Sequence, residues 1–189
     1  MQKSILKLVR RSLAAARLGF AFYGTSQTTF PKTVRLRGQR TPLSVPQDGG
    51  YLYDLINVWL DDEYGMHSID FPPRTVLDIG ANVGLFSLWA AHNFPGATIH
   101  AYEPNPKVHP HLSANLRGTS VKLFSTGLGA KRGRAEVLDH GQSRLASTTP
   151  NPEGVIEIEP IMDALDRLGG GVDLMKIDQC SPTSLLIEG

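Results

Sequence analysis

The sequence predicts an α/β fold built around a parallel central sheet. Short apolar stretches that fit strands alternate with stretches that fit helices, which is the pattern of parallel strands joined by helical crossovers. The length of 189 residues suits one ordinary domain. Hydrophobic residues make up 41% of the chain and charged residues 20%, so collagen-like, low-complexity and disordered chains are excluded.

The first 47 residues differ from the rest in charge. Nine Lys and Arg residues precede the first acidic residue, Asp48, so this segment carries +9 and the remainder carries −8. Residues 3–18 set Ile, Leu and Val among Lys and Arg in a loosely amphipathic helical pattern. Three interpretations of this helix stay open: packing on its own domain, contact with an anionic membrane or substrate, and a transit peptide.

The next segments are loops and one helix. Residues 24–50 are rich in Thr, Gly, Pro and Gln, and we expect loops with one short strand near Val34–Arg37. Apolar residues at helical spacing from Tyr51 to Tyr64 predict a helix, which Pro72-Pro73 separates from the next strand. We therefore predict a basic helix and loop segment over 1–47 and a second unit over 48–189.

From residue 75 onward strands and helices alternate. We expect strands at Thr75–Ile79, Ala97–Tyr102, Val121–Ser125, Ala135–Leu138, Val155–Glu159 and Val172–Ile177. We expect helices at Val83–Asn93, Asn105–Arg117 and Ile161–Leu168. Asn105 would be the N-cap of the second helix and Pro106 its first residue, because Asn and Pro favour these positions.

The turn between the first strand and its helix is the most informative stretch. An apolar strand ends at Asp78, turns through Gly80 and Gly84, and enters a helix. A helix N-terminus offers free N–H groups to a carboxylate or phosphate. Glu103 ends the next strand, where a nucleotide-binding α/β fold places the carboxylate that binds ribose hydroxyls. Asn82 stands where a dinucleotide-binding turn has its middle glycine, which disfavours an NAD-dependent oxidoreductase.

Three motifs in order resemble the FkbM-type S-adenosylmethionine-dependent methyltransferases. They are Asp78-x-Gly80-Ala81-Asn82-x-Gly84, Tyr102-Glu103-Pro104-Asn105-Pro106 and Val172-Asp173-Leu174-Met175-Lys176-Ile177-Asp178. The resemblance covers about residues 48–178. It implies a Rossmann-like methyltransferase fold that moves a methyl group from S-adenosylmethionine onto a hydroxyl of a small molecule, sugar or lipid-linked glycan.

The resemblance also assigns site residues. It implies that the methionine end of S-adenosylmethionine is lined by Asp78, Gly80, Asn82 and Gly84. Glu103 would hold the ribose, with Pro104 and Asn105 beside it. Asp178 closes the site at the end of the fourth strand, and it is our candidate for the catalytic base.

The sequence departs from the family pattern after Asp178. Directly after Asp178 the family usually has an acid–glycine pair and another acid, and Gln179-Cys180-Ser181-Pro182 has neither, although the closing Leu186-Ile187-Glu188-Gly189 is similar to the family. The chain also stops before the further strands that usually complete the sheet. We therefore expect a methyltransferase domain whose C-terminal strands are missing, with Val172–Ile177 left at an open edge. A catalytically inactive fragment that still binds the cofactor or another protein is the alternative.

The remaining candidate sites are weaker. The six histidines and the single Cys180 do not form a metal-ligand spacing, so we expect no metal and an inert thiol. No nucleic-acid-binding motif accompanies the basic segment, so we expect a small-molecule or glycan acceptor and no nucleic acid. Two locations stay open, cytoplasmic and membrane-peripheral, and the sequence leaves the oligomeric state open.

Overall fold

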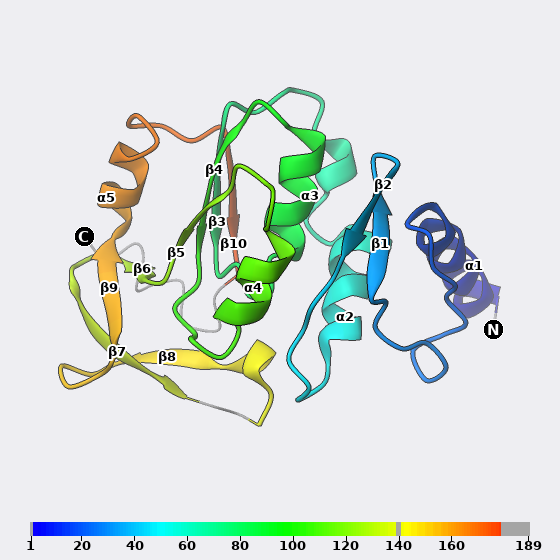
Figure 1. The fold of residues 1–189 in the computed structure, drawn as a ribbon, viewed down its shortest axis with the longest axis horizontal. Helices are drawn as coiled ribbons and strands as arrows, with labels where there is room; N and C mark the ends of the chain where they lie inside the picture. The colour runs from blue at the N-terminus through cyan, green and yellow to red at the C-terminus, as the bar shows by residue number, and fades with distance from the viewer. Residues whose placement is uncertain (1, 139–140, 179–189) are drawn as a thin grey trace.

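The computed structural model describes residues 2–138 and 141–178, whose elements lie in three groups along the longest axis (Figure 1). α1 and a β-hairpin lie at one end, a parallel sheet with its helices in the middle, and a second sheet at the other end. Cys180 and the departure over Gln179–Gly189 lie outside the described residues. Within the described ranges, no helix is long and apolar enough to cross a membrane.

The middle sheet has four parallel strands in the order β10-β3-β4-β5. Their bounds are Thr75–Ile79 for β3, Thr98–Tyr102 for β4, Lys122–Phe124 for β5 and Leu174–Ile177 for β10. Asp78 lies opposite Ala101 of β4 on one side and Lys176 of β10 on the other. The predicted α/β fold with a parallel central sheet is confirmed, and the carboxyl ends of β3, β4 and β10 meet at one edge.

Helices cover both faces of this sheet, so its strands are apolar on both sides. The helices are α2 (Tyr51–Leu55), continued by the π-helical turn η1 (Ile56–Leu60), α3 (Leu85–Asn93), α4 (His109–Asn115) and α5 (Ile161–Asp166). The larger core packs α2, α3 and α4 against Val76, Ile99 and Ala101. A smaller core packs α5 against Leu77, Ile79 and Tyr102 on the opposite face.

Two helices differ from the sequence prediction. The helix expected from Asn105 begins at His109 instead, because the Asn105 side chain accepts a hydrogen bond from the N–H of Lys107 (3.0 Å) and holds a local turn. The helix expected to reach Tyr64 ends at Leu60. Its continuation is stopped where Asp62 adopts a left-handed backbone (φ 54°) and binds the N–H of Met66 at 2.7 Å.

The second sheet was predicted only in part. Its order is β6-β9-β7-β8, with bounds Gly127–Gly129, Ile156–Pro160, Gly133–Leu138 and Ser147–Pro150 respectively. Two 3₁₀ turns complete the elements, η2 (Met66–Ser68) and η3 (Ser143–Leu145). The sequence indicated β7 and β9 but not β6 or β8. β6 reads Gly-Leu-Gly, and β8 has no apolar residue apart from its terminal proline, so neither shows the alternating pattern of a strand.

The first 47 residues pack against the rest of the chain. α1 (Gln2–Arg17) is followed by the antiparallel hairpin of β1 (Thr33–Leu36) and β2 (Gln39–Pro42). Ala15, Phe22, Val34, Leu36 and Leu43 belong to the same core as α2 and α3. Helix α1 therefore packs on its own domain through part of its surface, and the division at residue 47 stays a prediction.

Gly84 provides a test of how α3 is positioned. Its backbone is left-handed (φ 84°), and a Cβ there would lie 2.7 Å from Cδ1 of Leu112 in α4. Gly118 has a similar φ of 81° but has open space around it. We expect Gly84→Ala to lower the free energy of unfolding by about 1–3 kcal/mol more than Gly118→Ala, measured by urea denaturation. Equal losses in the two variants would contradict the close packing of α3 on α4.

Candidate functional site

Polar side chains gather where β3, β4 and β10 end. A cavity of about 70 Å³ at this edge is lined by Gly80, Asn82, Glu103, Pro104, Asn105, Ser143, Arg144, Ala146, Thr148 and Asp178. Six of the eight residues that the sequence assigned to a site are among them. Ligands of open α/β sheets bind at the carboxyl ends of the strands, so this cavity has the expected location.

Glu103 joins the two loops that come after β3 and β4. One carboxylate oxygen accepts a hydrogen bond from the N–H of Asn82 (2.7 Å) and the other from the N–H of Asn105 (2.8 Å). The side chain is buried, and burial raises the pKa of Glu103 although both N–H groups act in the opposite direction. A carboxylate has about four acceptor positions, so two stay available to a ligand in the cavity.

A buried ion pair supports the turn after β3. Asp78 is fully buried; its Oδ1 lies 3.1 Å from Nζ of Lys176, and its Oδ2 accepts a hydrogen bond from Ser87 (2.6 Å). Nζ of Lys176 also donates to the carbonyl of Gly80 at 2.6 Å. The lysine therefore neutralises Asp78 and fixes the first carbonyl of the turn.

Asn82 adopts a conformation that few residues other than glycine accept. Its φ is 51°, within the left-handed region that Asn tolerates better than most side chains. Its Oδ1 is buried and accepts no hydrogen bond from the described residues. Because buried acceptors are usually paired, this oxygen is positioned for a donor that a ligand would bring.

A second cavity of about 220 Å³ adjoins the first, and the two share Asn82, Arg144 and Asp178. Its lining includes the acids Asp54 and Glu63 and the aromatic rings of Tyr64 and Phe86. Arg144 donates to Asp54 at 3.0 Å, and burial raises the pKa of Asp54 to about 6 despite this arginine. Oδ2 of Asp54 is a further buried acceptor without a partner among the described residues.

Asp178 faces both cavities from the end of β10. Its carboxylate accepts a hydrogen bond from the hydroxyl of Tyr64 at 2.5 Å and lies 4.0 Å from Nζ of Lys176. Burial and the neighbouring Asp178 raise the pKa of Tyr64, so the phenol stays protonated and donates. The carboxylate is 57% exposed and is accessible from the cavities.

Asp78 and Gly84 are not among the residues that line the two cavities, and their assignment to the site stays a prediction. Asp78 lies under the turn, where Lys176 and Ser87 surround its carboxylate. Gly84 is the N-cap of α3 and packs against Leu112. Both residues therefore help to position the turn.

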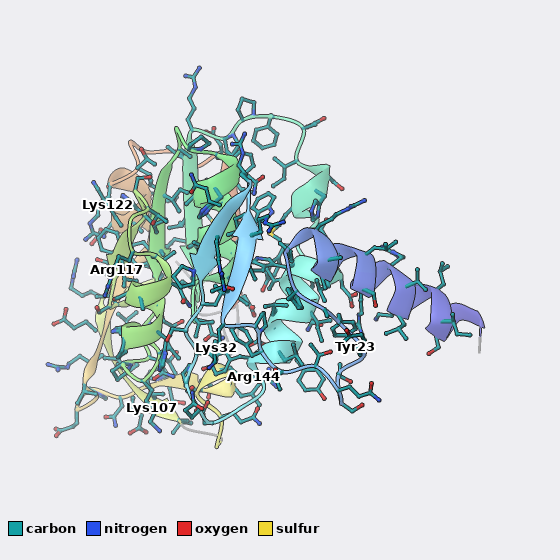
Figure 2. The ribbon with its side chains drawn as sticks, turned by 45° about the vertical axis from the view of Figure 1, so that its right-hand side comes forward. Tyr23, Lys32, Lys107, Arg117, Lys122 and Arg144 are labelled. Atoms are coloured by element: carbon teal, nitrogen blue, oxygen red, sulfur yellow. The ribbon has the colours of Figure 1, made fainter. Side chains whose placement is uncertain are left out.

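The sequence analysis missed the segment that closes the cavity from the second sheet. The N–H of Ser143 donates to Asp48 (2.7 Å), its hydroxyl bonds Tyr51 (2.6 Å) and its carbonyl accepts from Asn105 (3.1 Å). Arg144 follows Ser143 in the chain and packs directly on Gly50. A side chain at position 50 would not fit, because its Cβ would lie 2.0 Å from Nε of Arg144. Figure 2 shows Arg144 among the side chains below the central sheet. Most of these contacts join residues about 90 positions apart, and no local pattern signals them.

Comparisons with known proteins show which sequences and structures this chain is similar to. No family model matches the sequence. A stretch of 131 residues is 33% identical to the AMB antimetabolite synthetase AmbE of Pseudomonas aeruginosa, covering 66% of this chain and 6% of that protein. The chain is 41% identical over 59 residues to the 31-O-demethyl-FK506 methyltransferase FkbM of Streptomyces tacrolimicus, covering 31% of this chain and 23% of that protein.

Two further matches are to methyltransferases. The methyltransferase sdnD of Sordaria araneosa is 40% identical over 62 residues, covering 31% of this chain and 24% of that protein. A solved structure of a SAM-dependent methyltransferase from Agrobacterium tumefaciens is 16% identical, with a TM-score of 0.32, covering 58% of this chain and 37% of that one. The chain thus spans no more than 24% of the length of each of these three curated relatives.

The buried pair of Asp78 and Lys176 is tested by a double-mutant cycle. Lys176→Met leaves Asp78 buried without its cation, so we expect the free energy of unfolding to fall by about 3–5 kcal/mol. Adding Asp78→Asn removes the unpaired charge and should restore part of this loss. Urea denaturation of the two single variants and the double variant measures the coupling. Strictly additive losses would show that the two side chains do not interact.

Asp54 makes stability depend on pH. Its pKa is about 6 in the folded chain against 3.8 unfolded, so between these values the folded state binds more protons and stability falls as the pH rises. We expect a decline of up to about 3 kcal/mol between about pH 4 and pH 6, and a smaller one in Asp54→Asn.

Asp61 is the matched control for this pH dependence, because its pKa is lowered by its hydrogen bond to Arg11. The stability that Asp61 contributes is present above pH 3.8 and is lost as the pH falls below it. Asp61→Asn should therefore leave the decline between about pH 4 and pH 6 in place. A profile of Asp54→Asn that matches the unsubstituted chain would refute the role of Asp54.

Proposed function

We propose that this chain, which is related to the FkbM-type S-adenosylmethionine-dependent methyltransferases, binds S-adenosylmethionine at the strand-end cavities and methylates a hydroxyl group of a small-molecule acceptor. The observation on which this depends is Glu103, a buried carboxylate at the end of β4 that keeps free acceptor positions beside the turn after β3. A carboxylate at this place is suited to ribose hydroxyls.

The residues present fit the cofactor. Oδ1 of Asn82 and Oδ2 of Asp54 are buried acceptors without partners among the described residues, and each can take a hydrogen bond from a hydroxyl or an ammonium group. Glu103 would hold the ribose, and Pro104 and Asn105 lie beside it in the same lining. When bound, S-adenosylmethionine supplies a methyl carbon made electrophilic by its positive sulfur.

The charges around the second cavity favour a ligand with a positive group. Glu63 and Asp178 line it, while Lys176 is paired with Asp78 and Arg144 with Asp54. Arg144 lies where the two cavities meet; beyond its pair with Asp54, its remaining guanidinium N–H groups can bind a carboxylate. An amino acid end carries both an ammonium and a carboxylate, so this set of side chains complements it.

Asp178 is our candidate for the residue that accepts the proton. As the acceptor oxygen gains the methyl group and the sulfur–carbon bond breaks, the hydroxyl proton would move to the carboxylate of Asp178. Tyr64 holds this carboxylate in place through its hydrogen bond. The name of the Streptomyces relative describes methylation of an oxygen on a small molecule, which supports a hydroxyl acceptor here.

Calorimetric titration with S-adenosylmethionine and S-adenosylhomocysteine tests the binding site. In Glu103→Gln an amide NH₂ would face one of the two backbone N–H groups, so we expect affinity to fall at least about tenfold. Glu157→Gln, on an exposed position of β9, is the control and should bind normally. A chain that folds cooperatively and does not bind either compound would overturn the proposal.

A second variant separates binding from transfer. With saturating cofactor, Asp178→Asn should lose about 10²–10⁴-fold in turnover, measured as S-adenosylhomocysteine released with a panel of sugar and small-molecule alcohols. Unchanged turnover in Asp178→Asn would remove it as the proton acceptor. Binding without turnover in the unsubstituted chain would instead support the inactive cofactor-binding alternative.

A further inference from the structure

Helix α1 leaves four apolar residues on one side exposed. Ile5, Leu6, Val9 and Leu13 are 47–63% exposed, and at 100° per residue they fall within one arc of about 100°. An amphipathic helix on a soluble domain normally buries such an arc against its own core. Here the arc has no partner among the described residues.

The side of α1 that does face the protein is small and polar. Ala15 is fully buried, Arg11 forms two hydrogen bonds with Asp61 (2.8 and 2.5 Å), and the hydroxyl of Ser12 donates to the carbonyl of Phe22 at 2.8 Å. These contacts fix the orientation of the helix. The apolar arc is therefore exposed because of how α1 packs, and not because the helix is unattached.

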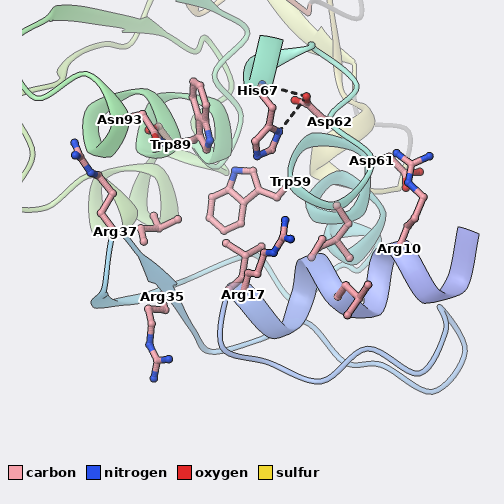
Figure 3. A pocket seen from close by; sticks show the side chains of 15 residues that line it. Arg10, Arg17, Arg35, Arg37, Trp59, Asp61, Asp62, His67, Trp89 and Asn93 are labelled. Atoms are coloured by element: carbon pink, nitrogen blue, oxygen red, sulfur yellow. Dashed lines mark hydrogen bonds and ion pairs between the residues drawn. The ribbon is translucent and has the colours of Figure 1, made fainter. Parts of the chain in front are cut away.

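An arginine-lined pocket lies beside this arc (Figure 3). It has a volume of about 540 Å³, with the rings of Trp59 and Trp89 inside it. Arg10, Arg17 and Arg35 contribute to its lining, and their side chains form no hydrogen bond or ion pair with the residues that the structure describes. On the helix, Arg10 and Arg17 directly flank Leu6 and Leu13.

Two acids, Asp61 and Asp62, line the pocket, and both already have partners within the chain. Asp61 pairs with Arg11 and with Lys7, whose Nζ lies 3.3 Å away. Asp62 accepts hydrogen bonds from the N–H groups of Met66 and His67. The exposed cations are therefore left without neutralising partners among the described residues, and the surface formed by α1 and this pocket is positive.

We propose that α1 and the adjoining pocket dock on an anionic lipid bilayer. The apolar arc would enter the acyl boundary, as interfacial amphipathic helices do, and Arg10, Arg17 and Arg35 would bind lipid phosphates. A second copy of the chain is a poorer occupant, because pairing two α1 helices would bring like charges together. The surface is separate from the strand-end cavities, so this proposal is independent of cofactor binding.

Co-flotation of the full chain with vesicles tests the proposal. We expect binding to vesicles of phosphatidylcholine and phosphatidylglycerol in equal parts, and at least about tenfold weaker binding to phosphatidylcholine alone. Raising the salt from about 0.1 M to about 1 M should also weaken binding, because the Debye length falls from about 10 Å to about 3 Å. Absence of binding to the anionic vesicles, or equal binding to both kinds, would overturn it.

Paired variants identify the surface that binds. Ile5→Ser with Val9→Ser, and separately Arg10→Glu with Arg17→Glu, should each reduce partitioning at least about tenfold. Arg117→Glu with Lys122→Glu is the control, since both side chains are exposed on the side of the molecule away from α1 (Figure 2). These positions are on the surface, so melting temperatures should stay unchanged.

Three results would overturn the proposal at this stage. Loss of binding only in the charge-reversal pair would show that the apolar arc does not insert. Equal loss in the Arg117 and Lys122 control would show attraction by overall charge alone. The third result would be dimers in the absence of lipid, measured by light scattering, that Ile5→Ser with Val9→Ser abolishes. It would show that the apolar arc binds a second copy of the chain.

Discussion

The turn at the centre of the candidate site depends on one buried charge pair. Lys176 and Asp78 lie opposite each other in register on β10 and β3, and both are almost completely removed from solvent. Two ions in such a place are costly to desolvate unless each is fully paired. Oδ2 of Asp78 accepts a hydrogen bond from Ser87, and Lys176 donates one to the carbonyl of Gly80. Oδ1 of Asp78 has the ion pair with Lys176 and no hydrogen bond among the described residues. The pair therefore couples the attachment of β10 to the shape of the loop that begins the ligand cavity.

Glu103, at the end of the neighbouring strand β4, is also a charged group that is buried and needs partners. Its burial is unfavourable for a charged carboxylate, which is why its pKa is raised even though two backbone N–H groups bind it. A Gln amide could not join the two loops in the same way, because its NH₂ would face one of the two N–H groups. A carboxylate that is kept despite its desolvation penalty, with acceptor positions still open, is typical of a group that has to meet a ligand.

The parts of the molecule that could be predicted are those in which neighbouring residues determine the outcome. Asp78, Gly80 and Asn82 lie within one strand–turn–helix unit, so their spacing alone predicted the turn, and Glu103 was found at the end of the next strand. Tyr64, Ser143 and Arg144 could not be found in this way, because they reach the cavities through contacts with residues far away in the sequence. The start of α4 was misplaced for a local reason, since Asn105 and Pro106 form a turn before the helix.

The uneven charge of the sequence has a spatial counterpart in the structure. The near-neutral total of +1 conceals a basic end, formed by α1 and the hairpin, and an acidic set of side chains at the strand ends. Charged side chains of opposite sign can neutralise each other where the first 47 residues pack against the rest of the chain. Arg11 does so with Asp61 and Arg144 with Asp54, whereas Arg10, Arg17 and Arg35 stay without partners among the described residues, and Glu63 and Asp178 line a cavity. The end formed by α1 thus presents arginines without partners among the described residues, while acids line the strand-end cavity, and the two proposed binding sites depend on this difference in charge.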